Sequence, residues 1–510
     1  MREKRFGAAW EDAVPIPVCE DRPEYLGFYK KAWALAYAHI RDIPGMPQTP
    51  YMDEAFCDTQ IWIWDTCFMS LFCKYARGVF PGVESLKNFY EVLHGAGRLP
   101  KIVPGEREPD WTGATPGVPA DIKIHIADNP PLFALAEYEN ALMSGDLAHI
   151  RELLYESGVL QKHYEWIEGL SEQVLPRGVL NETYLIHEDC GYRWEGGRSG
   201  MDNTPRGRRG ARAEAERPNN PDMLWLDAIC QQALSAKRIA ALFAIVGDEA
   251  ERDRWLAKYE EKKAIVNRLY LDGEERFYYD IDRFTHAHCK VATVASYWAL
   301  TAGIADMETA RNMAAHIYNE QTFGGPVPLV SLARNDADFD TDGLYWRGSL
   351  WLPTAYAALL GFREYGLLAE AQSAGQRILD HMLKTYETFE PHTIWECYAP
   401  NAPRPATVAE GTGELVRKDF CGWSALGAIS VYIEFVLGFH TVNAFENTVD
   451  WARPKGFEKA VGIKNLRFGE VVTDIVAEGA LCTVVSNAPY TLRIDGKPFA
   501  IQIGTNEIKL

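Results

Sequence analysis

The fold is decided by two neighbouring stretches, PDMLWLDAICQQALSAKRIAALFAIV at residues 221–246 and EAERDRWLAKYEEKKAIVNRLYL at residues 249–271. Apolar residues recur in both at the spacing that places them along one side of a helix. Only Gly247 and Asp248 separate the two stretches, so the pattern predicts two consecutive helices.

The same helical pattern continues outward from this pair over most of the chain. It covers residues 22–41, 58–77, 83–94, 131–144, 146–168, 291–302, 307–320, 350–364, 368–385 and 420–439. The segments come largely in consecutive pairs without a fixed sequence period, which disfavours a repeat array. Long irregular connections separate the pairs at residues 95–129, 175–220, 322–347 and 389–419. Loops of this length are uncommon unless they serve a site, so we expect them to form the walls of a pocket.

The tail of the chain has a different pattern. Residues 471–476 and 482–485 are rich in β-branched side chains in alternation, and Asp495-Gly496 is a strong signal for a two-residue hairpin turn. We therefore predict a helical domain at residues 1–440 and a small antiparallel β domain at residues 441–510, with the second packed on the first.

Composition and charge exclude several classes of protein. The chain has 71 acidic and 52 basic residues, a formal charge of -19, which disfavours binding to nucleic acid or to an anionic membrane. No stretch reaches the uncharged length of a membrane span, and the charged N-terminus lacks the apolar run of a secretory signal. Ten scattered cysteines show neither a disulfide framework nor zinc spacing, so we expect reduced thiols in a cytoplasmic protein. We expect no cofactor and no metal in the site, and a structural metal elsewhere stays open.

Aromatic residues point to a carbohydrate partner. The chain has 15 tryptophans and 24 tyrosines, and flat aromatic faces stack on the apolar faces of sugar rings. In the segment QIWIWDT at residues 60–66, Asp65 stands beside Trp62 and Trp64, either as an acceptor for sugar hydroxyls or as a helix N-cap. In the loop GRSGMDNTPR at residues 197–206, which follows Trp194, Asp202 is presented between turn-forming residues. Taken alone, this segment favours a structural Asx-turn, in which Asp202 bonds its own backbone, over a functional role.

Two further segments combine charged and aromatic residues. In GLYWRGSLW at residues 343–351, Arg347 follows Tyr345 and Trp346, and it could bind hydroxyls, orient a carboxylate or stack on tryptophan. In HTIWECY at residues 392–398, Glu396 lies among aromatic and apolar neighbours, and Trp423 follows the next loop. A glutamate in such surroundings is either paired or functional, because burial of a lone charge is costly.

The ordered set Trp-x-Trp-Asp, Ser-Gly-Met-Asp-Asn, Tyr-Trp-Arg-Gly and Trp-Glu-x-Tyr resembles the inverting α-glycosidases of glycoside hydrolase family 63. That family includes processing α-glucosidase and bacterial relatives, and it shares its barrel with the family 37 trehalases. The resemblance covers most of the first 440 residues and implies a mainly α fold, an (α/α)6 barrel of six inner and six outer helices. By position it implies Asp202 as general acid and Glu396 as general base. It implies a sugar-binding floor formed by Trp64, Asp65, Trp346 and Arg347. We expect the neighbouring aromatic residues of the same segments to complete the substrate-binding site: Trp62, Trp194, Tyr345, Trp395 and Trp423.

The expected reaction is hydrolysis, with inversion, of a terminal α-glycosidic bond in a small saccharide, most of all an α-glucoside. Trehalose, glucosylglycerate, mannosylglycerate and short α-gluco-oligosaccharides are all admissible. Arg198 stands where relatives often carry Glu, and we expect substrate choice to depend on it. Local competitors for the two carboxylate roles are Glu195, Glu410, Glu414 and Asp419.

Two other classes remain open from sequence. A helical-barrel isomerase or epimerase would transfer protons at carbon through histidines, for which the candidates are His125, His187, His286, His288 and His392. A non-catalytic carbohydrate-binding protein would bind sugar without turnover. The oligomeric state cannot be derived from these patterns.

Overall fold

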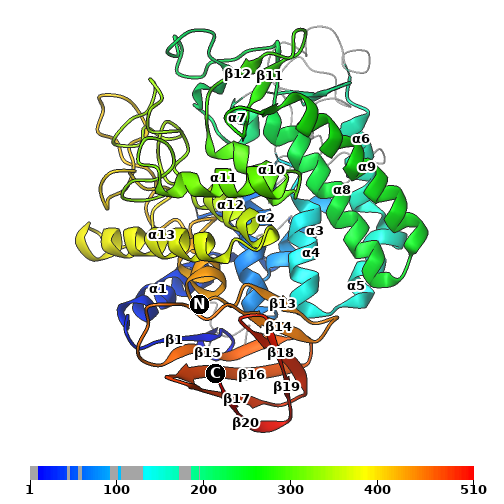
Figure 1. The fold of residues 1–510 in the computed structure, drawn as a ribbon, viewed down its shortest axis with the longest axis vertical. Helices are drawn as coiled ribbons and strands as arrows, with labels where there is room; N and C mark the ends of the chain where they lie inside the picture. Colours follow the sequence, from blue (N-terminus) through cyan, green and yellow to red (C-terminus); the bar gives the residue numbers. More distant parts are fainter. Residues whose placement is uncertain are drawn as a thin grey trace.

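The computed structural model describes residues 10–42, 46, 48–55, 60–91, 102–104, 130–171, 185–194 and 196–510. A large helical part carries a smaller β module at one end, drawn in orange to red in Figure 1. The mainly α character and the C-terminal sheet module predicted from sequence are both present.

The stretches 221–246 and 249–271 form α8 (Leu226–Val246) and α9 (Glu249–Leu269), which lie side by side in Figure 1. Gly247, with φ +81°, ends α8, and the Asp248 carboxylate caps α9 by accepting from the Glu251 N–H at 3.1 Å. Most of α8 is buried, whereas α9 buries only one face through Trp255, Tyr259, Lys262 and Val266. The pair therefore contains one inner and one outer helix.

By length and composition α8 could cross a membrane, with a mean hydropathy of 1.3 in its most apolar window. However, 72% of that window is buried inside the protein, as expected of a core helix. This is weak evidence for a membrane span, and among the described residues no second helix of that length and composition occurs.

The remaining helices repeat the division into buried and half-exposed members. Every residue of α2 (Ile63–Cys73) and of the π-helix η7 (Gly427–Val436) is buried. The others are α1 (Glu24–Ala38), α3 (Gly82–Glu91), α4 (Phe133–Ser144), α5 (Leu147–Arg151), α6 (Val159–Glu168), α7 (Gly196–Ser199), α10 (Trp298–Thr301), α11 (Met307–Ala315), α12 (Leu352–Glu364) and α13 (Leu368–Thr388).

Several expected helices are shorter or broken. The stretch 58–77 contains the short strand β4 (Gln60–Trp62) before α2, and the stretch 307–320 is α-helical only as far as Ala315. The stretch 146–168 is divided by Gly158, whose φ is +58°. A π-helical segment, Glu152–Ser157, ends just before this glycine, and α6 begins just after it. The stretch 291–302 contains a 3-10 turn, Val294–Tyr297, before α10, and the stretch 420–439 is regular only over η7. Periodicity alone does not distinguish these variants from an α-helix, because all place apolar residues on one side.

The β module has two sheets. One has the order β1-β15-β16-β17-β20 and the other β13-β14-β18-β19, and every pair is antiparallel except β14 with β18. Asp495 and Gly496 both have positive φ and form the predicted hairpin turn between β18 and β19. The strands are β13 (Thr441–Asn443), β14 (Thr448–Trp451), β15 (Val461–Phe468), β16 (Val471–Glu478), β17 (Leu481–Ser486), β18 (Tyr490–Ile494), β19 (Lys497–Ile501) and β20 (Gly504–Lys509).

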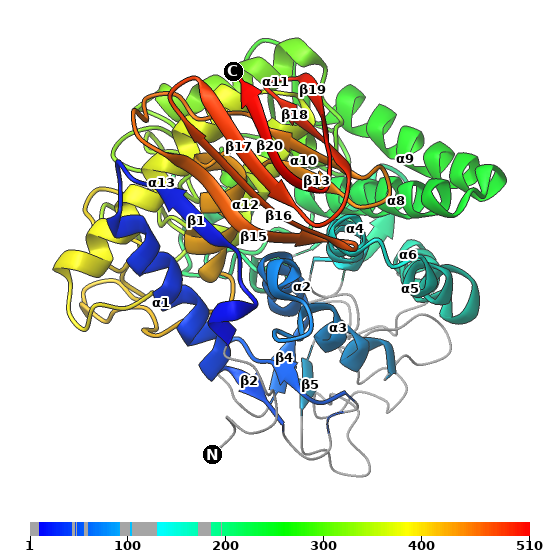
Figure 2. The same cartoon turned by 90° about the horizontal axis from the view of Figure 1, so that it is seen from below.

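One strand of the module comes from the other end of the chain. Strand β1 (Ile16–Cys19) pairs with β15, so the first sheet begins with an N-terminal segment. Figure 2, which views the molecule from the side of the β module, shows this blue strand beside the orange β15. The boundary at residues 440 and 441 stays a prediction.

Smaller strands occur within the helical part. A five-stranded sheet joins β6 (Ile186–Glu188), β7 (Gly191–Arg193), β8 (Met223–Leu224), β11 (Asp280–Asp282) and β12 (His288–Cys289). Two-stranded pairs are formed by β2 (Ile40–Arg41) with β3 (Tyr51–Met52), β4 (Gln60–Trp62) with β5 (Ile102–Pro104), and β9 (Leu271–Asp272) with β10 (Phe277–Tyr278).

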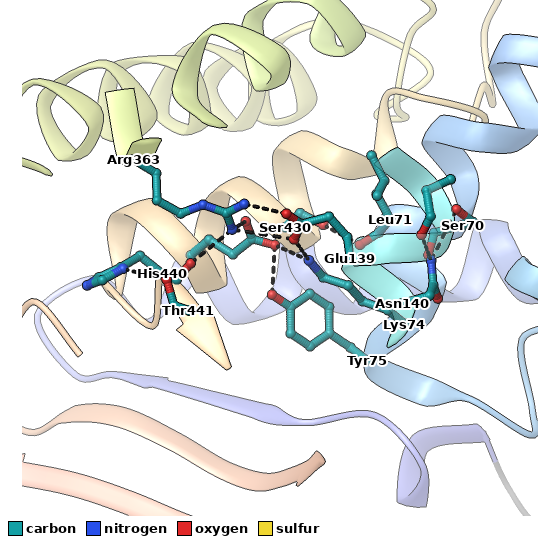
Figure 3. Close-up of polar contacts among 12 residues, drawn as sticks. Ser70, Leu71, Lys74, Tyr75, Glu139, Asn140, Arg363, Ser430, His440 and Thr441 are labelled. Carbon is teal, nitrogen blue, oxygen red and sulfur yellow. Dashed lines mark hydrogen bonds and ion pairs between the residues drawn. The ribbon is translucent and has the colours of Figure 1, made fainter. Parts of the chain in front are cut away.

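Buried charges hold the helices together at the end that faces the β module, as Figure 3 shows. Glu139 on α4 forms ion pairs with Arg363 on α12 and with Lys74, which follows α2. Glu434 on η7 accepts from the Tyr75 hydroxyl at 2.8 Å and lies 3.0 Å from the Lys74 ammonium. Burial works against ionisation of Glu139, but Arg363 and Lys74 lower its pKa to about 2.

This network predicts acid-sensitive stability. The pKa of Glu139 is lowered from 4.5 to about 2, so its stabilising effect is complete above pH 4.5 and is lost as the pH falls toward 2. We expect Glu139→Gln to lower the free energy of unfolding at pH 7 by about 3 kcal/mol, with a difference from wild type that shrinks below pH 4.5. Urea unfolding across pH measures this, with Glu260→Gln on the exposed side of α9 as control. A deficit independent of pH would contradict the linkage.

Candidate active site

The four sequence motifs meet around one pocket of about 320 Å³. Eight of the eleven residues predicted for the site line it: Trp62, Trp64, Asp65, Asp202, Tyr345, Trp346, Glu396 and Trp423. The lining also includes Gly197, Gly200, Arg217, Trp351 and Arg417.

The pocket lies at the N-terminal ends of two buried helices. Trp64 and Asp65 are in the first turn of α2, and Trp351 is the N-cap residue of α12. Asp65 is 2% exposed, so its carboxylate is held within the wall. Because α2 begins here and ends beside Lys74, the pocket and the charged network of Figure 3 occupy opposite ends of the same helix.

The Asp202 loop is fixed by its neighbours. Asn203 accepts from the Trp346 N–H at 2.8 Å and donates to the Leu344 carbonyl at 3.0 Å, which joins this loop to the third motif. Arg206 is buried between Asp227 and Asp280, at 2.7 and 2.6 Å. Asp202, which directly precedes these two anchors in the sequence, is partly exposed and lines the pocket.

Gly200 is required by a close approach to Trp64. Its φ is +85°, and a Cβ atom there would lie 2.5 Å from the Trp64 ring. We expect Gly200→Ala to displace the indole and to lower kcat/KM at least about tenfold, with a loss of stability of about 1 kcal/mol from the positive φ. Steady-state kinetics and thermal unfolding separate the two effects. Gly411→Ala is the matched control, since Gly411 has φ +70° and a Cβ atom there would meet nothing within 4 Å. Equal activity of both variants would show that the indole position is unimportant.

Glu396 is buried and firmly oriented. Its carboxylate accepts from Arg417 Nη1 at 2.7 Å, from the Arg417 backbone N–H at 3.2 Å and from the Tyr345 hydroxyl at 3.1 Å. Its own carbonyl accepts from Trp423 Nε1 and Ser424 Oγ, both at 3.0 Å. Burial and the nearby carboxylates of Glu396 and Asp202 raise the pKa of Tyr345 well above its ordinary value, so the hydroxyl remains a donor.

The segment that carries Tyr345 has an unusual backbone. Leu344 and Tyr345 have φ values of +32° and +61°, a conformation that non-glycine residues adopt at an energetic penalty. The Tyr345 N–H donates to the Thr407 carbonyl at 2.8 Å, and Trp351 Nε1 donates to the Tyr345 carbonyl at 3.0 Å. Trp346 stacks on Trp351 with ring centroids 4.1 Å apart. These contacts hold a locally strained turn in one position beside Glu396.

Three predicted site residues do not line the pocket. Arg347 donates to the backbone carbonyls of Asn203, Ala215 and Glu216, so it supports the loop that precedes Arg217. Trp194 and Trp395 are buried behind the wall, at 3% and 4% exposure. Arg198, expected to influence substrate choice, is in α7 outside the lining.

The competitors for the carboxylate roles that lie in the described part of the chain do not line the pocket. Glu410 and Glu414 are exposed, and the Asp419 carboxylate accepts from the Thr393 hydroxyl. Within the described part of the chain no histidine lines the pocket, and no group of three or more His, Cys, Asp or Glu side chains could hold a metal ion. Glu195 and His125 are outside the described residues.

Trp351, Arg217 and Arg417 line the pocket but were not among the predicted site residues. Trp351 belongs to the quoted third motif, so its aromatic pattern could have found it. Arg217 and Arg417 lie on irregular loops without a flanking motif, and only the fold brings them to the pocket.

Asp65, Asp202 and Glu396 line a tryptophan-rich pocket on a helical scaffold, an arrangement typical of a glycoside hydrolase. The family model described as mannosylglycerate hydrolase MGH1-like glycoside hydrolase domain matches residues 59–411, and the chain belongs to this family. The resemblance to glycoside hydrolase family 63 is thereby confirmed, and the chain is a glycosidase.

Individual relatives agree with this assignment. A mannosylglycerate hydrolase of Rubrobacter radiotolerans is 28% identical over 34% of this chain and 39% of its own length. A mannosyl-oligosaccharide glucosidase of Saccharomyces cerevisiae is 25% identical over 52% of this chain and 33% of its own. The chain thus matches less than half the length of these two relatives. The crystal structure of a family 63 mannosylglycerate hydrolase from Thermus thermophilus has a TM-score of 0.56 at 18% identity, covering 79% of this chain and 99% of that one, which shows a shared fold.

Proposed function

We propose that this enzyme hydrolyses a terminal α-glycosidic bond of a small glycoside in a single displacement with inversion. Asp202 donates a proton to the leaving oxygen, and Glu396 removes a proton from the water that attacks the opposite face of the sugar. The observation that carries the proposal is that both carboxyl groups line the same pocket of about 320 Å³. This volume suits a small saccharide.

The arrangement around Glu396 supports its role as base. Arg417 and the Tyr345 hydroxyl both donate to the carboxylate, which fixes its direction in the pocket. Arg417 is about half exposed, so water reaches this side of the site.

We further propose that the helices form an (α/α)6 barrel. The mostly buried helices are α2, α4, α8, α10, α12 and η7, and each is adjacent in sequence to a more exposed helix or, for η7, packs against α13 and α1. Six inner helices with outer partners are the arrangement expected of this barrel.

An α-glucoside remains the leading substrate, and the lining favours an acidic aglycone. Two guanidinium groups, those of Arg217 and Arg417, line the pocket, and Arg417 is already paired with Glu396. A carboxylate on the aglycone would therefore find Arg217 as its partner. Glucosylglycerate and mannosylglycerate fit this feature better than trehalose does.

The test is a screen of glucosylglycerate, mannosylglycerate, trehalose and maltose, with NMR detection of the first-formed anomer. Release of a β-sugar is expected. First release of the α-anomer would refute inversion, a changed monosaccharide without cleavage would support an isomerase, and tight binding without turnover would support a binding protein.

The role of Arg217 has a separate readout. We expect Arg217→Gln to raise KM for a glycerate glycoside at least about tenfold and to change KM for an uncharged aryl glycoside less than about twofold, because only the first carries a carboxylate. Arg209→Gln is the control, since the Arg209 side chain is 63% exposed and pairs with Asp222. Equal effects on both substrates would remove the acidic aglycone from the proposal.

A further inference from the structure

A second cavity, of about 240 Å³, lies where the helical part meets the β module. Its lining includes Lys74, Tyr138, Glu139, Arg238, Arg363 and His440. Helix α2 begins at the Asp202 pocket and ends here, and its 11 residues separate the two hollows by roughly 16 Å at 1.5 Å per residue. The cavity is therefore distinct from the proposed active site.

The charges around this cavity balance. Three cations, Lys74, Arg238 and Arg363, face three carboxylates, Glu139, Glu364 and Glu434. Arg363 pairs with Glu139, Lys74 lies 3.0 Å from Glu434, and Arg238 lies 3.5 Å from Glu364. Burial and Arg363 lower the pKa of His440 to about 4, so this imidazole is uncharged at pH 7. Every carboxylate has a cationic partner, which leaves no site for a metal ion or an ammonium group.

An anion is also disfavoured. Helices α2, α4 and α12 all end at this cavity, and helix C-termini carry partial negative charge. The lining therefore selects for a neutral molecule that can both donate and accept hydrogen bonds.

Arg238 has an unsatisfied donor in this lining. The residue is 8% exposed, and its Nε atom is buried without a hydrogen-bond partner. Its guanidinium carbon lies 4.6 Å from the centre of the Tyr138 ring, which also lines the cavity. A buried donor without a partner costs about 1–3 kcal/mol, so a ligand that turns this donor toward the cavity and accepts from it is stabilising.

We propose that this cavity binds a small neutral polyhydroxylated molecule, a polyol or a single monosaccharide. On binding, the Arg238 guanidinium turns so that Nε donates to one hydroxyl oxygen, the neighbouring hydroxyl donates to Glu364, and the apolar face of the ligand packs on Tyr138. Hydroxyl groups suit this lining because each can donate to a carboxylate and accept from a guanidinium.

The test uses D-mannose and glycerol as probes. Trp64→Ala weakens binding at the Asp202 pocket, so in this background we expect a remaining saturable rise in Tm with each probe. Adding Arg238→Gln should raise the probe concentration that gives half of this Tm rise at least tenfold. Adding Arg254→Gln, which removes an exposed arginine of α9, should leave that concentration unchanged. Crystals soaked in D-mannose should show the sugar against Arg238 Nε.

A second variant keeps the test decisive if Arg238→Gln does not fold. Leu142 lines the cavity, and Leu142→Trp fills it without altering a charge, so it should also abolish the response. Identical responses with and without these changes would show general stabilisation by cosolvent and overturn the proposal. Crystals that show only water at Arg238 under saturating D-mannose would overturn it too.

Discussion

Asp202→Asn is expected to lower kcat for a glycoside with a poor leaving group by about 10³-fold or more. General acid catalysis contributes roughly 10²–10⁴-fold, and an amide cannot supply the proton that the leaving oxygen requires. Asparagine preserves the shape of the side chain, and the loop remains anchored by Asn203 and Arg206. Folding should therefore be unaffected, and near-wild-type turnover would make the acid assignment wrong.

Two measurements separate this role from a binding role. A glycosyl fluoride leaves without protonation, so Asp202→Asn should retain far more activity on it than on a glycerate glycoside. The wild-type profile of kcat/KM against pH should be bell-shaped, and the variant should lose the fall at high pH that reports deprotonation of the acid. Glu214→Gln, an exposed change on the following loop, is the matched control and should leave both profiles unaltered.

The helical part of the fold could be predicted because its signals are local. Periodic apolar residues, the Gly247 ending and the Asp248 cap specify α8 and α9 from their own sequence. The pairing of β1 with β15 joins segments more than 400 residues apart, and no local pattern reports such a contact. The breaks at Gly158 and before α10 depend on backbone dihedrals that periodicity does not encode.

The pocket was predictable to the extent that its residues occur in motifs. Trp64, Asp65, Tyr345 and Glu396 were found because each belongs to a compact aromatic and acidic pattern. Arg347 belongs to such a pattern as well, yet three backbone carbonyls accept from its guanidinium behind the wall. A motif specifies which residues are near the site, whereas the direction of each side chain depends on hydrogen bonds formed by distant loops.

Glu396→Ala tests the opposite face of the reaction. Removal of the proposed base should lower turnover by about 10²–10⁴-fold, because water is no longer activated.

The deletion also leaves a space beside Arg417, whose guanidinium donates to the missing carboxylate in the wild type. Azide is a small anion that needs no base, so added azide should restore product formation in the variant and yield a β-glycosyl azide. Glu414→Gln, on the same loop as Arg417 but exposed, should keep wild-type turnover and gain nothing from azide. An α-glycosyl azide would place the nucleophile on the wrong face for inversion, and the absence of rescue together with full turnover would transfer the base role away from Glu396.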